Sequence, residues 1–300
     1  MSEDAALLQL LRLLKQADYR FTAVTPATHA RVLARPCERP DLRDIFGWNR
    51  AFVQRELPAE MLQCLRQSGM VEQLGEKLRS KVRVARLGNN LFLHSAFPTT
   101  SADAVFFGPD TYRFVRFVRE RMPEGAKWIV DMGAGSGAAA IAAAQLAPSA
   151  RVTAVDVNPV ALRFGRINAE AASVTVEPVQ ADKIPTDPDL VIANPPYIMD
   201  ASKRSYRDGG DLLGGQVALE WTQQALRSLA PGGTMLLYTG ASVANGQAPL
   251  ISALEQACAA HSTELEIEET DADVFGEELD QPAYSEVERI AVICATIRKT

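Results

Sequence analysis

Histidine and cysteine are scarce in this chain, with three and four residues in 300. The cysteines (Cys37, Cys64, Cys258 and Cys294) form no CxxC pair, so we expect neither a zinc site nor a disulfide framework. No run of about 18 apolar residues occurs, which argues against a transmembrane helix. The N-terminus, Met-Ser-Glu-Asp, lacks the basic start and cleavage site of a signal peptide. We therefore expect a soluble, cytoplasmic protein with no bound metal and no membrane partner.

A dense run of Lys and Arg is also absent, yet the net charge of −6 is unevenly distributed. Residues 1–127 carry 20 Lys and Arg against 14 Asp and Glu, whereas residues 128–300 carry 11 against 23. Such a split can mark a module that faces nucleic acid or the ribosome beside an acidic catalytic one. An ordinary solvated surface explains it as well, so the charge alone does not identify a partner.

Residues 1–104 predict a mostly helical N-terminal domain with one small hairpin. Leucine at helical spacing indicates a helix over residues 5–17, and residues 42–52 and 58–69 predict two more. Alternating apolar residues at 82–86 and 90–94 flank a Gly-Asn-Asn turn, which predicts the hairpin. We interpret this domain as a substrate-recognition module or a lid.

Residues 105–300 predict a second domain, in which strands and helices alternate from residue 127. Strands are expected at residues 127–131, 152–156, 174–179, 189–193, 234–239, 264–268 and 289–297. Helices are expected at residues 137–146, 159–171, 216–229 and 247–261. This alternation is typical of a parallel α/β sheet covered on both faces. No helix separates the last two strands, so their pairing makes one of them antiparallel.

A glycine-rich loop follows the first of these strands, in Asp131-Met-Gly133-Ala-Gly135-Ser-Gly137. Glycines permit a tight turn and close approach of a ligand to the backbone, and the next helix presents free N–H groups. Asp156 ends the second strand, where a carboxylate can accept both ribose hydroxyls. The same spacing also satisfies a nicotinamide-dinucleotide fingerprint, so the loop predicts a nucleotide site without choosing the nucleotide.

The third strand leads into Gln180-Ala-Asp182-Lys183. An acidic side chain at this position can meet an adenine amino group. A solvated loop aspartate is the alternative.

The fourth strand runs directly into Asn194-Pro195-Pro196-Tyr197. Ligands of open parallel sheets bind at the carboxyl ends of strands, which places this tetrapeptide beside the glycine loop. The –NH₂ group of a substrate can donate one hydrogen bond to the Asn194 side-chain oxygen and another to the Pro195 carbonyl. Tyr197 can lie against a planar group. These two bonds draw a delocalised nitrogen lone pair toward tetrahedral geometry, so catalysis rests on positioning rather than on a strong base.

These motifs together resemble class I S-adenosyl-L-methionine (SAM)-dependent methyltransferases with an Asn-Pro-Pro-Tyr loop. That group includes glutamine methyltransferases of release factors and ribosomal proteins, and adenine-N6 and guanine-N2 methyltransferases. The resemblance implies a Rossmann-like sheet of seven strands with the last one antiparallel, and S-adenosyl-L-homocysteine as product. It assigns the methyl acceptor to the loop residues named above, Asn194, Pro195 and Tyr197. It implies cofactor binding by Thr111, Asp131, Gly133, Gly135, Gly137, Asp156, Val157, Asp182, Lys183 and Asn194.

Two further segments are similar to glutamine methyltransferases. Residues 105–111 resemble a segment that carries Pro-Glu-Thr in those enzymes, but Gly108 replaces an arginine and Asp110 replaces the glutamate. Residues 206–213 resemble a glycine-rich segment that follows their acceptor loop. Residues 1–100 do not resemble the five-helix domain with which those enzymes grip release factors.

Charged segments near the expected site leave the acceptor open. Arg113, Arg116 and Arg119 form a basic stripe that either contacts phosphate or pairs with acids. Residues 264–288 hold eleven acidic residues, which would repel nucleic acid on the same face. Alternatively, residues 271–285, with Phe275 and Tyr284, form a mobile gate over a small substrate.

The sequence therefore predicts a SAM-dependent N-methyltransferase that acts on a planar amide or amine nitrogen, in a protein glutamine or an RNA base. The alternative is a biosynthetic methyltransferase for a small molecule, with the N-terminal segment as a lid. A non-catalytic SAM-binding protein is the least favoured, because it has no use for an acceptor loop. A nicotinamide dehydrogenase is weaker still, because no acid/base set is visible.

Overall fold

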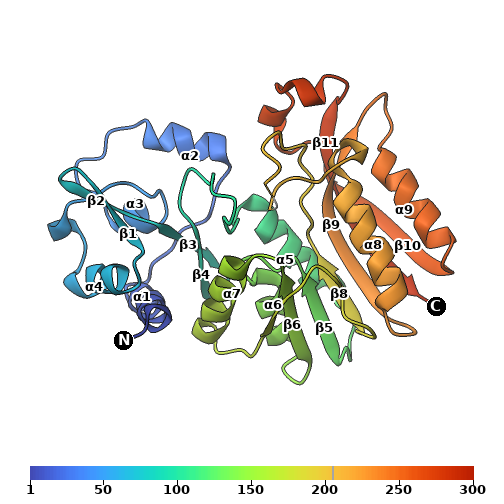
Figure 1. Cartoon of the computed structure of the whole chain (residues 1–300), viewed down its shortest axis with the longest axis horizontal. Helices are drawn as coiled ribbons and strands as arrows, with labels where there is room; N and C mark the ends of the chain where they lie inside the picture. Colours follow the sequence, from blue (N-terminus) through green and yellow to red (C-terminus); the bar gives the residue numbers. More distant parts are fainter. Residues whose placement is uncertain (205) are drawn as a thin grey trace.

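The computed structural model describes residues 1–204 and 206–300. Figure 1 shows two lobes side by side: a smaller N-terminal lobe, coloured blue to teal, and a larger α/β lobe, coloured green to red. Within the described residues, no helix combines the length and the apolar character needed to cross a membrane.

The α/β lobe is built on a seven-stranded sheet of order β10-β11-β9-β8-β5-β6-β7. The strands are β5 (Trp128–Met132), β6 (Arg151–Asp156), β7 (Glu177–Gln180), β8 (Leu190–Ala193), β9 (Thr234–Val243), β10 (Thr263–Asp271) and β11 (Arg289–Lys299). β11 is antiparallel to both of its neighbours, β9 and β10, and the other neighbouring pairs are parallel. This topology confirms the expected Rossmann-like methyltransferase sheet with its antiparallel strand.

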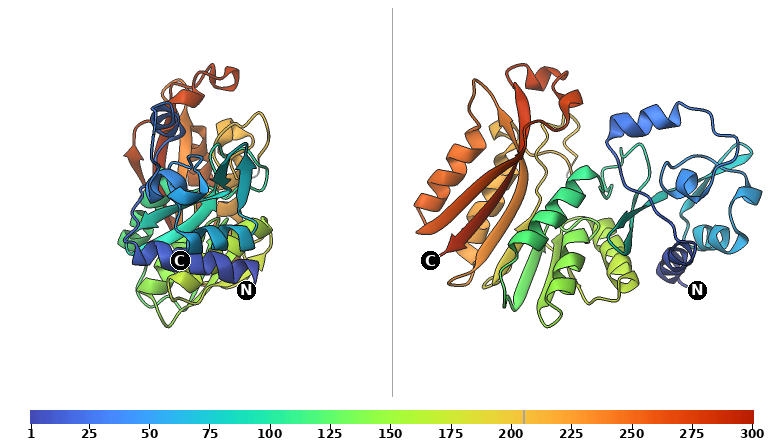
Figure 2. Two further views of the ribbon diagram at one scale, coloured as in Figure 1. Left: turned by 90° about the vertical axis from the view of Figure 1, so that its left-hand side faces the viewer. Right: turned by 180° about the vertical axis from the view of Figure 1, so that it is seen from behind.

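Helices cover both faces of this sheet, because consecutive strand residues point to opposite sides. The long helices are α5 (Pro109–Arg121), α6 (Ala138–Leu146), α7 (Pro159–Ala171), α8 (Gln216–Ser228) and α9 (Pro249–Ala259), and three short 3₁₀ turns span Leu212–Gly214, Gly276–Glu278 and Pro282–Tyr284. Ile129 of β5 belongs to the core with α5, α6 and α7, whereas the next residue, Val130, belongs to the core with α8. Figure 2 shows this layering from behind.

The N-terminal lobe holds four helices and two hairpins. They are α1 (Glu3–Gln16), α2 (Pro26–Leu33), α3 (Leu42–Phe46), α4 (Ala59–Gln67), β1 (Val71–Leu74), β2 (Lys77–Ser80), β3 (Val82–Leu87) and β4 (Asn90–Ser95), with a 3₁₀ turn at Gln54–Glu56. The first helix, the last helix and the β3–β4 hairpin follow the expectation. The helix expected to reach residue 52 ends at Phe46, and the positive φ of Asn49 (+58°) takes the chain out of helical geometry.

Two N-terminal elements were absent from the sequence prediction. No helix was predicted at α2, where the Thr25 side chain caps the first turn and Pro26 occupies it. The β1–β2 hairpin was missed because its residues are mostly polar and exposed, so they carry little hydrophobic periodicity.

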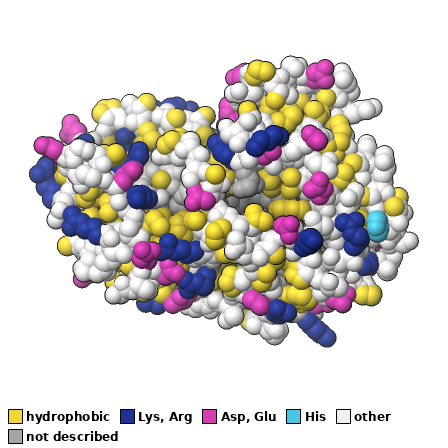
Figure 3. All heavy atoms as spheres, in the orientation of Figure 1, with side chains coloured by type: hydrophobic (Ala, Val, Ile, Leu, Met, Phe, Trp, Pro, Cys, Tyr) yellow, Lys and Arg dark blue, Asp and Glu magenta, His cyan; other side chains and the backbone are white. Residues whose placement is uncertain are grey.

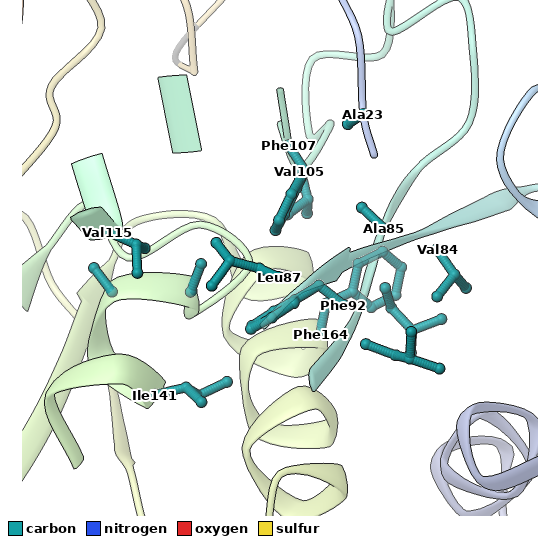
Figure 4. Close-up of a cluster of buried hydrophobic side chains, with 14 of the residues drawn as sticks. Ala23, Val84, Ala85, Leu87, Phe92, Val105, Phe107, Val115, Ile141 and Phe164 are labelled. Atoms are coloured by element: carbon teal, nitrogen blue, oxygen red, sulfur yellow. The ribbon is translucent and has the colours of Figure 1, made fainter. Parts of the chain in front are cut away.

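One hydrophobic core joins the two lobes. Phe92 of β4 and Phe164 of α7 lie in the same buried cluster, together with Val115 of α5 and Ile141 of α6 (Figure 4). The buried Asn168 side chain of α7 adds polar contacts, since its Oδ1 accepts from Leu93 N (2.8 Å) and its Nδ2 donates to Ser136 O (2.9 Å). The N-terminal hairpin is therefore bonded, through one side chain, to the glycine loop. The boundary at residue 104 stays a prediction.

Candidate functional site

A cavity opens at the carboxyl ends of β5, β6 and β8. It encloses about 1260 Å³ of space between atoms, its open mouth included. Four segments meet in its wall: the glycine loop, the residue pair after β6, the Asn-Pro-Pro-Tyr loop and the first turn of α5. Residues 104–106, which lead into α5, also line it.

The three loop glycines all have positive φ, but they face different neighbours. A Cβ on Gly133 (φ +70°) would lie 2.4 Å from the Trp221 ring, whereas one on Gly135 (φ +53°) would have Gly133 O of the same loop, at 3.9 Å, as its nearest neighbour. Gly137 (φ +75°) faces away from the cavity, with Gly165 Cα of α7 3.2 Å from its would-be Cβ. Gly133 and Gly135 line the cavity, and the structure gives Gly137 a helix-packing contact instead. A cofactor role for Gly137 stays a prediction.

The two aspartates at the strand ends both face the cavity. Asp131 is buried, its Oδ2 accepts from Ala140 N (2.9 Å), and burial raises its pKa to about 7, with a smaller contribution from the negative charge of Asp156. The Asp156 carboxylate accepts from Gly135 N and Asn158 N, at 2.8 Å each. Burial raises the pKa of Asp156, and these backbone donors oppose the rise. The loop and both carboxylates are thus fixed by backbone bonds.

Of the other residues predicted to bind the cofactor, some line the cavity and some do not. Thr111 and Val157 line the cavity, and Val157 is 51% exposed there, so it offers an apolar surface. Asp182 and Lys183 are solvent-exposed and follow Ala181, which does line the cavity. Their contact with adenine stays a prediction.

Asn194 and Pro195 lie in the cavity wall, directly after β8. The Asn194 Oδ1 atom is buried and accepts no hydrogen bond from residues 1–204 or 206–300. A buried amide oxygen without a donor is costly, typically by about 1–3 kcal/mol. The site therefore holds an acceptor group that a ligand N–H can satisfy.

Tyr197 is anchored rather than free. Its hydroxyl donates to Asp110 of α5, and Tyr238 of β9 donates to the other carboxylate oxygen at 2.9 Å. Arg113 lies 3.2 Å from the same carboxylate. Burial, followed by the Asp110 charge, raises the pKa of Tyr197 well above its usual value, so the phenol stays protonated and is no base.

Asp110 lines the cavity, and the sequence had assigned it no role in the site. The available signal was its place in the segment that resembles Pro-Glu-Thr, where it stands for the glutamate. A buried carboxylate that accepts from two tyrosines explains why an acid is needed there.

Two loops cover the acceptor side of the cavity. The backbone carbonyl of Arg207 accepts a hydrogen bond from Ile198 N (3.1 Å). The Arg207 side chain forms an ion pair with Glu278 of the C-terminal loop. The Tyr284 hydroxyl accepts from Met199 N at 2.7 Å, and the Phe275 ring meets the edge of Tyr197 at a centroid distance of 6.0 Å. The segment interpreted as a gate thus contacts the acceptor loop, while its mobility stays a prediction.

Two of the three arginines in the basic stripe on α5 are paired with acids. Arg113 contacts Asp271 at 2.7 Å, and Arg116 contacts Glu120 at 2.7 Å. Figure 3 shows basic and acidic side chains interspersed over the visible face, without a continuous basic surface. The arrangement favours a paired helix face over a phosphate site.

Among the described residues, no group of three His, Cys, Asp or Glu side chains is arranged to hold a metal ion.

Comparison with known proteins places this fold and cavity among the methyltransferases. Residues 114–268 match the family model of the methyltransferase small domain, and the chain belongs to that family. It is 31% identical over 155 residues to a release factor glutamine methyltransferase of Koribacter versatilis, covering 46% of this chain and 55% of the relative. A Deinococcus radiodurans protein of the same name is 28% identical over 248 residues, covering 77% and 85%. The chain spans about half the length of the first curated relatives it matches.

Among solved structures, Trm5b from Pyrococcus abyssi aligns with a TM-score of 0.51 at 17% identity. The alignment covers 76% of this chain and 62% of that protein. At this identity the likeness shows a shared fold only.

Proposed function

We propose that the protein is a SAM-dependent N-methyltransferase that acts on a planar amide or amine nitrogen, in a protein glutamine or an RNA base. The observation that carries this proposal is the buried Asn194 Oδ1 atom in the cavity wall, which lacks a donor among the described residues. It lies one residue beyond β8, and β8 pairs with β5, the strand that leads into the glycine loop. An acceptor nitrogen and a nucleotide cofactor can therefore meet in one cavity.

The cofactor side fits SAM in its donor set. Gly135 leaves open space toward the cavity, and Asp131 offers a carboxylate to a ligand ammonium group. Asp156 retains lone pairs for ribose hydroxyls, and Val157 presents apolar surface to an adenine ring. When bound, SAM supplies an electrophilic methyl group on a sulfonium, and S-adenosyl-L-homocysteine is the product.

The acceptor side positions the nitrogen. Asn194 Oδ1 accepts one N–H of the acceptor, and the Pro195 carbonyl, which no described residue hydrogen-bonds, accepts the other. These bonds orient the lone pair and stabilise the positive charge that develops on nitrogen. Asp110 holds Tyr197 and thereby the loop, so Asn194 is fixed before the acceptor arrives.

The acceptor molecule is proposed to be a protein or an RNA. The curated relatives that match are named for release factor glutamine, which supports a protein. Pairing of the α5 arginines also supports a protein, because it leaves little unpaired positive charge beside the cavity.

Transfer of label from tritiated SAM tests the proposal. Purified enzyme is added to lysate from cells that lack its gene, and protein, RNA and small-molecule fractions are counted. We expect label in the protein or RNA fraction, and none with an Asn194→Ala enzyme used as the matched control. Label confined to small molecules would indicate a biosynthetic enzyme, and no label above the control would overturn the proposal.

A further inference from the structure

Two tyrosines line the acceptor side of the cavity, and they differ in what their rings can contact. Tyr197 belongs to the loop itself and is only 6% exposed. Tyr206 lies nine residues further on and is only partly buried. The sequence assigns contact with a planar acceptor to Tyr197, but the packing distinguishes the two residues.

The Tyr197 ring is occupied by its protein neighbours. Gly240 of β9 packs against it so closely that a Cβ there would lie 2.1 Å from Tyr197 Cδ2. The Phe275 ring meets it at an interplanar angle of 65°, and the hydroxyl is bound to Asp110. Little of this side chain is left for a ligand, and its contacts are those of an anchor.

The Tyr206 ring is partly open but firmly held. Its hydroxyl donates a hydrogen bond to Thr99 O at 2.7 Å and accepts one from Arg204 Nη1 at 3.3 Å. The Arg204 guanidinium lies 5.8 Å from the ring centroid, and Asp200 fixes that guanidinium through Arg204 Nε at 2.8 Å. An aromatic ring fixed in this way presents a rigid apolar surface at little cost in conformational entropy.

The N-terminal lobe sets the position of this ring. Thr99 lies on the segment between β4 and α5. A hydrogen bond from Ser95 N to Val105 O (3.0 Å) closes this segment into a loop. The Asn49 side chain accepts from Phe97 N (2.8 Å), and the buried Arg83 donates to Ser95 O (2.9 Å). Residues 95–99 are thus tied to the N-terminal lobe, and Thr99 O transmits that position to the cavity.

We propose that Tyr206, held by Thr99 of the N-terminal lobe, is the residue that packs against the planar acceptor group and sets acceptor affinity, whereas Tyr197 only positions the loop. This inference rests on the proposed methyl transfer. It gives the N-terminal lobe a direct part in acceptor binding, through one hydrogen bond at the rim of the cavity.

The test compares Tyr206→Leu, Tyr206→Phe and Tyr197→Phe, using as acceptor the lysate fraction that the wild-type enzyme labels. Contact with the ring contributes to binding before and during transfer, so its loss raises KM rather than lowering kcat. We expect Tyr206→Leu to raise the acceptor KM about tenfold or more, as for loss of a stacking aromatic, with kcat changed less than about threefold. Tyr206→Phe keeps the ring but loses the bond to Thr99 O, so its acceptor KM should lie between those of the wild type and Tyr206→Leu.

Tyr197→Phe should give the opposite split, with a lower kcat and a smaller change in KM. The SAM dissociation constant of each variant, measured by calorimetry, reports whether the cofactor side is intact. Equal KM values for Tyr206→Leu and wild type, or a KM rise for Tyr197→Phe alone, would overturn the inference. If the wild-type enzyme labels nothing, the proposed function fails first and this inference fails with it.

Discussion

The two walls of the cavity differ in how completely their polar groups are satisfied. On the cofactor wall, Asp131 and Asp156 already accept backbone N–H groups, and the glycine loop is held in one conformation. On the acceptor wall, Asn194 Oδ1 and Arg207 Nε are buried without a hydrogen bond from the described residues, although Arg207 Nε lies 3.6 Å from Asp200. One wall is complete before a ligand binds, and the other is completed by it.

This difference indicates a division of labour. A preorganised wall binds its ligand with little rearrangement, which suits a cofactor that every turnover uses. A wall with unsatisfied polar atoms rejects groups that cannot supply the missing hydrogen bonds, which suits selection of the acceptor. Substitutions on the two walls should therefore separate cofactor binding from transfer.

Removal of the Asn194 side chain should have the largest effect on transfer. Asn194→Ala deletes the oxygen proposed to orient the acceptor nitrogen, so kcat should fall by about a thousandfold, the upper range for loss of one positioned polar group. The SAM dissociation constant, measured by calorimetry, should change less than about threefold. Equal losses of binding and turnover would show that Asn194 serves the cofactor wall instead.

Removal of the Asp156 carboxylate should show the reverse pattern. Asp156→Ala deletes the proposed ribose ligand and the acceptor for Gly135 N, so SAM binding should weaken by about 2–4 kcal/mol. Calorimetry on Asp182→Ala provides the comparison. Its side chain is exposed and outside the cavity wall, so a loss below about 1 kcal/mol is expected. A larger loss for Asp182→Ala than for Asp156→Ala would reverse the two assignments.

Much of the cofactor wall could be predicted from sequence, because its residues follow strands whose carboxyl ends meet at one edge. Asp131, Gly135 and Asp156 are examples, and their shared cavity confirms only that they lie together. The contacts of Asp110 and Tyr206 could not be predicted. Asp110 contacts Tyr197 across 87 residues of chain, and Tyr206 contacts Thr99 across 107. Contacts between such distant residues leave no periodic pattern in the local sequence, so they could not be predicted from it.

The same reason explains the success and the failures in the fold. In the α/β lobe, buried apolar strands such as β8 and β9 alternate with amphipathic helices such as α7 and α8, and these patterns can be recognised locally. In the N-terminal lobe, α2 spans only eight residues and β1 is polar and partly exposed, so tertiary packing outweighs such weak local signals.

Asp110 offers a way to loosen the Asn-Pro-Pro-Tyr loop without changing a residue of that loop. Asp110→Asn removes the negative charge that accepts from Tyr197 and Tyr238 and faces Arg113, so we expect a loss of about 2–3 kcal/mol in the free energy of unfolding. Urea denaturation measures that loss. In kinetic assays kcat should fall about tenfold to a hundredfold, because the loop is less well positioned.

Asp110→Glu is the matched control, since it restores the carboxylate with one extra methylene. It should recover part of kcat and of the stability. If Asp110→Asn instead weakened SAM binding while kcat stayed near wild type, the α5 carboxylate would belong to the cofactor wall, and the contrast between the walls would be wrong at this point.

A change of pH tests the cofactor wall without a substitution. Asp131 has a pKa of about 7 in the folded protein, raised mainly by burial, so it is protonated below that pH and cannot pair with a ligand ammonium group. SAM affinity should therefore fall about fivefold between pH 7 and pH 6, and about tenfold for each further unit, while the ligand amine stays charged.

Stability of the free protein should move in the opposite direction. The unfolded chain releases the Asp131 proton near its ordinary pKa of 3.8, and the folded chain releases it only near 7. The folded state thus holds more protons between these values, so the contribution of Asp131 to stability is present below about pH 4 and is lost as pH rises to about 7. Asp131→Asn should remove both dependences, as measured by calorimetry and urea denaturation. SAM affinity that is flat from pH 7 to pH 5.5 in the wild-type protein would separate Asp131 from the ligand and leave its burial as a purely structural feature of the glycine loop.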